Sequence, residues 1–365
     1  MKNIKIIEHG VIYRNPSSPF CYNGWPTVAR LSDDSLAVVW SGFRIAHVCP
    51  FGKTAMSISW DEGKNWGPPM VINDTPLDDR DAGILSTSDN NLLVSWFCHP
   101  KQWMLETALP PAKEYLPAEL YSLFEGYSGI YDKMTPEEGR GGSFVRLSED
   151  NGITWGDTIR VPVSSPHGPA KLADGSLVYL GQDLFEGTGK IYAYSSEDKG
   201  KTWALLSTLE MPQIPENFKF YEPHAVQLPD GSLLGTLRYE GQSAFTVYTT
   251  RSTDLGKSWS IPSPLIPAGS DSPVCGSPPH LTVLSSGTVI CSVGRRKKPF
   301  GQRALVSYDS GVNWEEFVIR DDAPNGDLGY PATVELKDKS LLTVYYQCYG
   351  NDRMPGILYT RWALV

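Results

Sequence analysis

The segment SEDKGKTW, residues 196–203, carries the pattern Ser-x-Asp-x-Gly-x-(Thr/Ser/Asn)-Trp, which occurs five times in this chain of 365 residues. The other copies are SWDEGKNW (59–66), SEDNGITW (148–155), STDLGKSW (252–259) and SYDSGVNW (307–314). In such a copy the Asp can accept hydrogen bonds from turn amides and the Gly can adopt a positive φ. The Trp can then fold back as an apolar plug. The pattern therefore predicts five β-hairpin turns and accounts for five of the eleven tryptophans.

A second repeat of twelve residues occurs six times between these turns. Its copies are WPTVARLSDDSL (25–36), DAGILSTSDNNL (81–92), PHGPAKLADGSL (166–177), EPHAVQLPDGSL (222–233), PPHLTVLSSGTV (278–289) and YPATVELKDKSL (330–341). Each copy ends in turn residues and is followed by a short apolar run, which predicts a strand, a tight turn and a second strand. The final residues of the copies are 56, 85, 56, 56 and 52 positions apart, so there are six units and one of them carries an insertion.

Each unit therefore contributes four strands, with the Trp-containing turn before the fourth, and six such units in a ring form an all-β six-bladed β-propeller. We expect one domain over residues 1–365, made of four-stranded antiparallel blades. The sixth unit ends after its third strand, so the N-terminal segment 4–13 should supply the missing strand and close the ring. The extra residues of the second unit, about 98–142, are helix-prone and predict a helical insertion that packs, supports an oligomer, or forms a lid over a ligand.

The composition excludes several classes of partner. The net charge of −9, from 32 Lys and Arg against 41 Asp and Glu, argues against nucleic acid and anionic membranes. No apolar run approaches the roughly 18 residues of a membrane span. The first residues, MKNIKIIEHGVIYR, lack the apolar core of a secretory signal, and six cysteines are scattered without CxxC spacing. We expect a cytoplasmic protein with reduced thiols, or a secreted one if the sequence represents a mature form, and no cofactor.

The topology predicts which side chains meet on the axis. The twelve-residue units begin with Trp25, Asp81, Pro166, Glu222, Pro278 and Tyr330, which should lie on one rim of the ring. The loops after the second strands add Arg44, His47, Arg238, Arg295, Arg296 and Arg303 to that rim. Gathered guanidinium groups indicate that an anionic group such as a carboxylate binds there. The alternative is that they form ordinary loop ion pairs. The five Trp-containing turns lie on the opposite rim, so their Asp residues should be structural.

The repeats and three further segments resemble the sialidase (neuraminidase) superfamily over essentially the whole chain. EPHAVQLPDGSLLGTLR (222–238) is similar to the segment that carries a catalytic Glu and an Arg of the carboxylate-binding triad. GQRALVSYDSG (301–311) resembles the segment with another triad Arg, and GYPATVEL (329–336) resembles the segment with the nucleophilic Tyr. The resemblance implies a glycoside hydrolase that removes a terminal acidic sugar from a glycan. Tyr330 would be its nucleophile, Glu222 the base, and Arg238 and Arg303 the clamp. A neutral phenol suits such a substrate because a carboxylate next to the anomeric carbon repels a carboxylate nucleophile.

Two departures from the family pattern leave the chemistry open. Gly24-Trp25-Pro26 stands where the family has Arg-Ile-Pro, and residues 41–60 contain no acid where the family places its acid/base Asp. Arg44 or Arg80 could replace the missing guanidinium. His47, Asp79 or Asp81 could replace the missing acid, and Asp81 is preferred because it opens a strand on the rim. One alternative is a propeller glycosidase or lyase that uses Asp81 or a His on a non-sialic sugar. Another is a carbohydrate-binding propeller without catalysis.

Three histidines, His167, His224 and His280, fall at the starts of inner strands in successive units. Without an accompanying carboxylate pattern they predict hydrogen bonds to substrate hydroxyls, or simple packing, rather than a metal site. Trp25 and Tyr346 are candidates to stack on a sugar ring. The expected partner is therefore a glycan or oligosaccharide.

Overall fold

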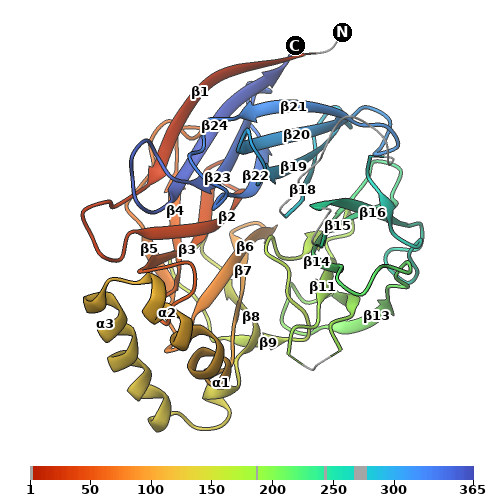
Figure 1. The fold of residues 1–365 in the computed structure, drawn as a ribbon. Coiled ribbons are helices and arrows are strands. Elements are labelled where there is room, and N and C mark those ends of the chain that lie inside the picture. The colour runs from red at the N-terminus through yellow and green to blue at the C-terminus, as the bar shows by residue number, and fades with distance from the viewer. Residues whose placement is uncertain (1–2, 186–187, 242–244, 267–277) are drawn as a thin grey trace.

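Six four-stranded antiparallel sheets surround one axis in the computed structural model, which describes residues 3–185, 188–241, 245–266 and 278–365 (Figure 1). Five sheets are each built from four consecutive strands, and the sixth combines the last three strands with the first. The first strands of neighbouring blades pack against one another around the axis. The prediction of a six-bladed β-propeller is confirmed.

The strands of the six blades have the following bounds. Blade 1 consists of β2 (Tyr22–Arg30), β3 (Leu36–Arg44), β4 (Lys53–Ser59) and β5 (Met70–Asn73), and blade 2 of β6 (Asp79–Ser88), β7 (Asn91–Cys98), β8 (Gly142–Ser148) and β9 (Ile159–Val161). Blade 3 consists of β10 (Ala170–Lys171), β11 (Leu177–Gln182), β12 (Ile191–Ser196) and β13 (Ala204–Thr208), and blade 4 of β14 (Lys219–Gln227), β15 (Leu233–Glu240), β16 (Phe245–Ser252) and β17 (Ser263–Pro264). Blade 5 consists of β18 (His280–Val283), β19 (Val289–Arg295), β20 (Gly301–Ser307) and β21 (Glu315–Arg320), and blade 6 of β22 (Gly329–Glu335), β23 (Leu341–Gln347), β24 (Gly356–Leu364) and β1 (Ile4–Tyr13).

The N-terminal strand closes the ring, as predicted. β1 pairs antiparallel with β24 from Ile4 opposite Leu364 to Tyr13 opposite Ile357. Both ends of the chain therefore lie together at one edge of blade 6 (Figure 1). This arrangement pairs the outer edge of β24, which would otherwise be free to pair with another chain.

The Trp-containing turns have the hydrogen bonds that their sequence predicts. In the turn after β12, the Ser196 hydroxyl accepts from the Gly200 amide at 2.8 Å, and Asp198 Oδ1 accepts from the Thr202 amide at 2.8 Å. Trp203 Nε1 donates to the Gly200 carbonyl at 3.1 Å, and its ring packs on the apolar cluster between blades 2 and 3. The other four turns repeat the Ser–Gly and Asp–amide bonds. These carboxylates hold turns together and are structural.

The insertion of blade 2 is helical, as expected, and lies between β7 and β8. It contains α1 (Lys101–Trp103), a π-helical turn (Met104–Ala108), α2 (Leu109–Tyr115), α3 (Ala118–Ser128) and two 3₁₀ turns (Gly129–Lys133 and Glu138–Arg140). Its buried side chains, such as Met104 and Phe124, pack against Ile45, Leu77 and Trp96 of blades 1 and 2. The insertion is thus a packing element on the outside of the ring (Figure 1). No helix among the described residues is long and apolar enough to cross a membrane.

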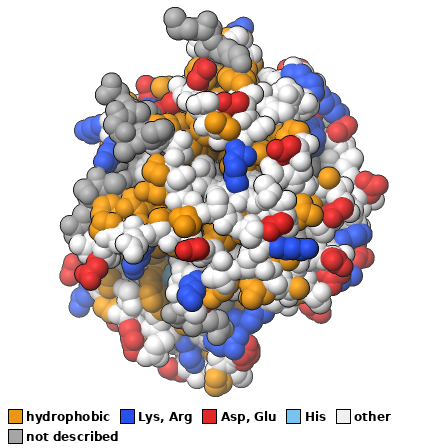
Figure 2. Space-filling model, turned by 90° about the vertical axis from the view of Figure 1, so that its right-hand side faces the viewer, with side chains coloured by type: hydrophobic (Ala, Val, Ile, Leu, Met, Phe, Trp, Pro, Cys, Tyr) orange, Lys and Arg blue, Asp and Glu red, His pale blue; other side chains and the backbone are white. Residues whose placement is uncertain are grey.

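Charges are mixed on the side of the molecule that carries β13 and β16. Figure 2 shows Lys and Arg interspersed with Asp and Glu on this face. A surface of this kind offers no continuous basic stripe for a phosphate backbone.

Five cysteines of the described residues are free and buried (Cys21, Cys49, Cys98, Cys291 and Cys348). Cys275 lies outside the described residues.

Candidate active site

Four inner strands share an unusual backbone bend at the rim. Trp25, Asp81, Glu222 and Tyr330 have φ values of 57°, 52°, 49° and 50°. Each lies within a register shift between the inner strand and its neighbour. A β-bulge re-aims side chains, and a left-handed non-glycine residue costs about 1–3 kcal/mol. The same bend in four blades therefore sets the direction of the four side chains that begin the repeats.

Tyr330 and Glu222 are in direct contact across the axis. The Tyr330 hydroxyl donates a short hydrogen bond to Glu222 Oε1, and Arg238 Nη1 donates to Glu222 Oε2 at 2.8 Å. Burial raises the pKa of Tyr330 well above its usual value of 10.0, and the carboxylates of Glu222 and Asp81 add to this effect. Arg238 and Arg296 act in the opposite direction. The phenol is therefore neutral at rest, with its proton directed at a carboxylate that can accept it.

Asp81 is a buried acid in the same group. It is 6% exposed, and its Oδ1 atom has no hydrogen-bond partner among the described residues. Burial raises the pKa of Asp81 from 3.8 to about 7, with a further contribution from the Glu222 carboxylate, whereas Arg80 lowers it. A carboxyl that is half-protonated near neutral pH is suited to donate a proton. Asp79, the neighbouring candidate, instead accepts hydrogen bonds from Asn73 and from the Thr75 amide, both at 2.9 Å.

These side chains line one pocket of about 210 Å³ on the rim. The pocket contains Arg80, Asp81, Glu222 and Tyr330, together with Phe97, His99, Ser164, Ser165, Pro166, Gln182, Leu184 and Tyr221. Pockets for drug-sized ligands measure about 300–1,000 Å³. This pocket, which we call the catalytic pocket after the role that we propose for it, is therefore sized for a single small ring.

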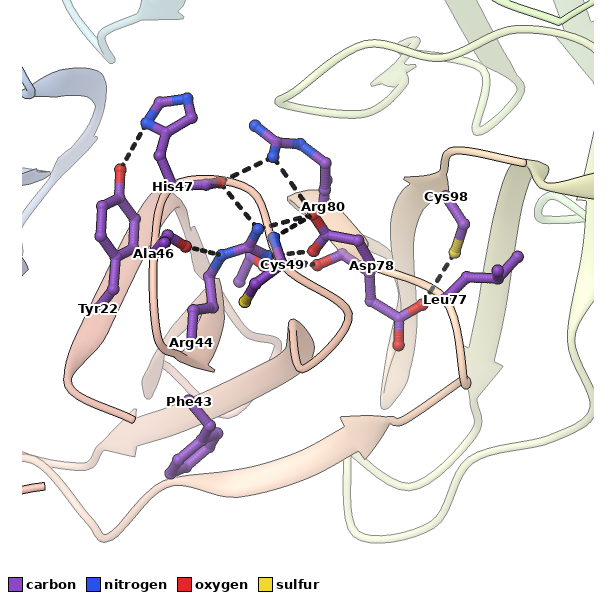
Figure 3. Close-up of polar contacts among 12 residues, drawn as sticks. Tyr22, Phe43, Arg44, Ala46, His47, Cys49, Leu77, Asp78, Arg80 and Cys98 are labelled. Atoms are coloured by element: carbon purple, nitrogen blue, oxygen red, sulfur yellow. Dashed lines mark hydrogen bonds and ion pairs between the residues drawn. The ribbon is translucent and has the colours of Figure 1, made fainter. Parts of the chain in front are cut away.

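Arg44 is enclosed in an ion pair next to this pocket (Figure 3). Its Nη2 donates to Asp78 Oδ2 at 2.7 Å, and both side chains are 0% exposed. Arg44 Nε also donates to the Ala46 carbonyl at 3.3 Å. Although burial would raise the pKa of Asp78, Arg44 and Arg80 hold it below its usual value. Arg44 is therefore a structural residue that pairs with Asp78 and does not line the pocket. No motif or repeat position in the sequence marked Asp78 as its partner.

Replacing Arg44 with Ala should lower stability and not substrate binding alone. The change leaves Asp78 buried and without its main partner, which costs about 3–5 kcal/mol. Urea unfolding followed by tryptophan fluorescence would measure the loss. The double variant Arg44→Met with Asp78→Leu should recover part of it. An Arg44→Ala protein with unchanged stability and weakened ligand binding would show that Arg44 contacts the ligand.

Arg80, the other candidate to replace the missing guanidinium, lines the pocket. Its guanidinium carbon lies 4.3 Å from the centre of the Trp25 ring, and its Nη1 donates to the His47 carbonyl at 2.8 Å (Figure 3). Arg80 lines the pocket, whereas Trp25 is only 1% exposed. Trp25 therefore serves as a platform for Arg80 through a cation–π contact, and it does not present a face to a sugar ring.

His47 belongs to a polar network on the blade 6 side of Trp25. Its Nδ1 lies 2.8 Å from the Tyr22 hydroxyl and 3.3 Å from Asp327 Oδ1. Asp327 also accepts from the Tyr346 hydroxyl at 3.2 Å. His47 is not among the residues that line the catalytic pocket. Sequence reasoning missed Tyr22 and Asp327, because no repeat position marks them.

The sequence placed both Arg303 and Arg296 on the rim and the resemblance gave Arg303 the clamp role, but the two arginines have different surroundings. Arg303 Nη1 donates to the carbonyls of Gln302 and Arg320, both at 3.0 Å, so these contacts lie within blade 5. Arg296 instead lies with its guanidinium carbon 5.9 Å from the centre of the Tyr330 ring, and its Nη2 donates to the Tyr346 hydroxyl at 3.0 Å. The structure therefore brings Arg296, and not Arg303, next to the phenol. Arg303 sits on the third strand of its blade, farther from the axis than the inner strands.

The three histidines face a different cavity. Their ring centres lie 4.7, 4.8 and 5.6 Å apart, and all three line an axial cavity of about 350 Å³ that is separate from the catalytic pocket (His167, His224 and His280). His224 Nδ1 accepts from the Leu281 amide at 3.0 Å, and burial lowers its pKa to about 3. Burial also lowers the pKa values of His167 and His280, so the three rings are neutral and pack on one another on the axis, and none of them lines the pocket that contains Tyr330. Among the described residues, no group of three or more His, Cys, Asp and Glu side chains is arranged to hold a metal ion.

The fold and this site define a class: a six-bladed β-propeller with a phenol, two carboxylates and arginines gathered at one end of its axis. Residues 133–344, more than half of the chain, match the BNR repeat-like domain family. The chain belongs to this family and is a sialidase-like propeller.

Solved structures share the fold at low sequence identity. A protein of unknown function from Dyadobacter fermentans is 22% identical with a TM-score of 0.76, and each chain is covered over 100% of its length. The intramolecular trans-sialidase of Ruminococcus gnavus is 14% identical with a TM-score of 0.66, covering 97% of each chain. The α-L-arabinanase of Penicillium chrysogenum, solved with arabinobiose, is 16% identical with a TM-score of 0.62, covering 97% of this chain and 98% of its own. No curated protein sequence matches the chain.

Proposed function

We propose that the protein is a sialidase-like exo-glycosidase that removes a terminal acidic sugar from a glycan. The observation that carries this proposal is the hydrogen bond from the Tyr330 hydroxyl to Glu222, inside a pocket that also contains the protonatable Asp81. A phenol is a poor nucleophile unless a base takes its proton, and Glu222 is positioned to do so.

The reaction follows from these contacts in two steps. Tyr330 Oη attacks the anomeric carbon while Glu222 accepts the phenolic proton, and Asp81 protonates the leaving oxygen as the glycosidic bond breaks. Asp81, now ionised, then takes a proton from water, and the resulting hydroxide attacks the anomeric carbon. The bond to Tyr330 breaks and the phenol regains its proton from Glu222. Two inversions give net retention of configuration.

An acidic substrate is supported by the charges around the phenol. Arg80 lines the pocket, and the guanidinium groups of Arg238 and Arg296 lower the pKa of Tyr330 from nearby positions. A carboxylate on the sugar would pair with Arg80, which uses Nη1 for its hydrogen bonds to the His47 carbonyl and to Asp78 Oδ2. Sialidases are known to use a Tyr nucleophile in place of a carboxylate.

A neutral sugar is the second candidate, and a specific observation favours it. Arg44 and Arg238 are already paired with carboxylates, Asp78 and Glu222, so fewer guanidinium groups remain for a substrate carboxylate. The similarity to the arabinanase is compatible with this alternative at the level of the fold. The same Tyr330, Glu222 and Asp81 would then act on an uncharged ring.

The two candidates differ in what Arg80 does. Wild-type protein should release 4-nitrophenol from 4-nitrophenyl α-sialoside. The variant Arg80→Gln should raise KM for this sialoside by about tenfold or more, because a hydrogen bond to a charged group contributes about 1.5–3 kcal/mol. The 4-nitrophenyl α-L-arabinofuranoside serves as the neutral control. Cleavage of the arabinofuranoside alone, with no effect of Arg80→Gln, would favour the second candidate. Cleavage of neither, with measurable glycan binding, would contradict both and favour a binding protein.

A further inference from the structure

A groove of about 590 Å³ lies between blades 3 and 4, on the same rim as the catalytic pocket. We call it the blade 3–4 groove, and its lining consists of residues 182–184 and 189–191 of blade 3 and residues 211, 212, 214 and 218–221 of the segment that leads into blade 4. Gln182, Leu184 and Tyr221 line both the groove and the pocket. The two hollows therefore meet at these three residues, and the groove extends outward from the proposed site of bond cleavage.

The junction between the two hollows is fixed by hydrogen bonds. Gln182 Nε2 donates to the Gly189 carbonyl at 3.1 Å and to the Phe220 carbonyl at 3.4 Å. The first bond stays within blade 3, and the second connects the end of β11 to β14, the inner strand of blade 4. Because the connection lies at the shared floor, the groove is formed before any ligand arrives, which lowers the ordering cost of binding.

The wall of the groove has the chemistry of a sugar-binding surface. Phe218 stacks on Tyr239 with ring centres 5.1 Å apart and an angle of 16° between the rings, so the Phe218 ring is held in place. Tyr221 is half-buried at the junction, and the Arg238 guanidinium carbon lies 5.8 Å from the centre of its ring. The exposed Lys190 and Lys219 add N–H donors along the groove. Aromatic faces combined with a few donors suit the apolar face and hydroxyls of a pyranose ring.

We propose that the blade 3–4 groove is a leaving-group subsite, which holds the sugars joined through the scissile bond to the terminal residue in the pocket. This inference rests on the proposed function. The pocket of about 210 Å³ takes one ring, whereas the groove of about 590 Å³ takes two or more. The natural substrate is accordingly an oligosaccharide chain and not a small glycoside, and the groove selects it by length.

The variant Ile214→Trp tests the subsite, because Ile214 lines the groove and not the pocket. The substrates are 3′-sialyllactose, whose leaving group is a disaccharide, and the 4-nitrophenyl sialoside, whose leaving group is short. We expect kcat/KM for the trisaccharide to fall about tenfold or more, and kcat/KM for the aryl glycoside to stay within about twofold. The control is Ile153→Trp, the same change at a residue that is 80% exposed in a turn on the opposite rim. Equal effects on both substrates, or none, would overturn the subsite.

A binding measurement separates this inference from the proposed function. Tyr330→Phe protein, with and without Ile214→Trp, is applied to an array of immobilised monosaccharides and oligosaccharides. Preferential binding of oligosaccharides that Ile214→Trp abolishes supports the groove, even if the wild-type protein cleaves neither substrate. If no oligosaccharide binds better than its terminal monosaccharide, the groove is not a glycan subsite, whatever the hydrolysis assays show.

Discussion

Tyr330→Phe should reduce kcat by about 10³-fold or more, while the protein folds normally. The substitution removes only the hydroxyl that donates to Glu222 Oε1 and that we propose attacks the anomeric carbon. The effects on rate of substituting residues that act together are not additive, and loss of the nucleophile alone removes most of the rate enhancement that these residues provide. Steady-state hydrolysis of the 4-nitrophenyl sialoside measures the effect.

The structure also limits what the change does to stability. Glu222 keeps its partner Arg238 at 2.8 Å, so the loss is one hydrogen bond, worth about 1 kcal/mol. Tyr346→Phe is a matched control, because Tyr346 is a second buried phenol beside Arg296 and has no contact with Glu222. Undiminished turnover by Tyr330→Phe would remove Tyr330 from the nucleophile role, and equal losses in both variants would indicate a general effect of the site's phenols.

Asp81→Asn should reduce kcat by about 10²–10⁴-fold on a natural oligosaccharide and by much less on the 4-nitrophenyl glycoside. A 4-nitrophenolate leaves without help from an acid, whereas a sugar alkoxide needs a proton. The difference between the two substrates is the measurement. Equal losses on both would indicate that Asp81 positions the substrate and does not donate a proton.

The pKa of Asp81 fixes the sign of the pH dependence. A general acid works in its protonated form. The kcat/KM of wild-type protein for an oligosaccharide substrate should therefore fall above pH 7, as the Asp81 carboxyl with its pKa of about 7 ionises. Asp81 binds its proton more tightly in the folded protein than in the unfolded chain, where its pKa is 3.8. The stabilisation that this proton contributes is therefore complete below pH 3.8, decreases as the pH rises, and is lost above about pH 7. Asp81→Asn carries no such charge, and its melting temperature should exceed that of wild type at pH 8 by more than at pH 5. A rate profile of wild type that is flat from pH 6 to 9 would contradict this assignment.

Local turn chemistry explains why so much of the fold could be predicted from the sequence. The Ser, Asp, Gly and Trp of each repeated turn satisfy one another within eight residues, as in the turn from Ser196 to Trp203. Repeat spacing then determines the number of blades, and the incomplete sixth repeat identifies β1 as the closing strand. Glu222 and Tyr330 each begin a copy of the twelve-residue repeat, and they meet because the topology places the inner strands around one axis.

The remainder of the site depends on contacts between blades that no local pattern records. Arg44 was a candidate for the pocket, yet its guanidinium pairs with Asp78 from the next blade. The direction of each side chain depends on a backbone bulge, so Asp81 enters the pocket while His224 faces the axial cavity. Whether an arginine such as Arg303 reaches the axis depends on which strand of its blade carries it.

The pairing of β1 with β24 has a consequence for biosynthesis. Among the strands of the six blades, β1 is synthesised first and its partner β24 last, so the two can pair only after the other strands have been made. Until then the blades already made form an open ring, with two unpaired edges that other nascent chains could join. Shielding of the β1 segment during this interval should therefore favour closure of the ring over aggregation.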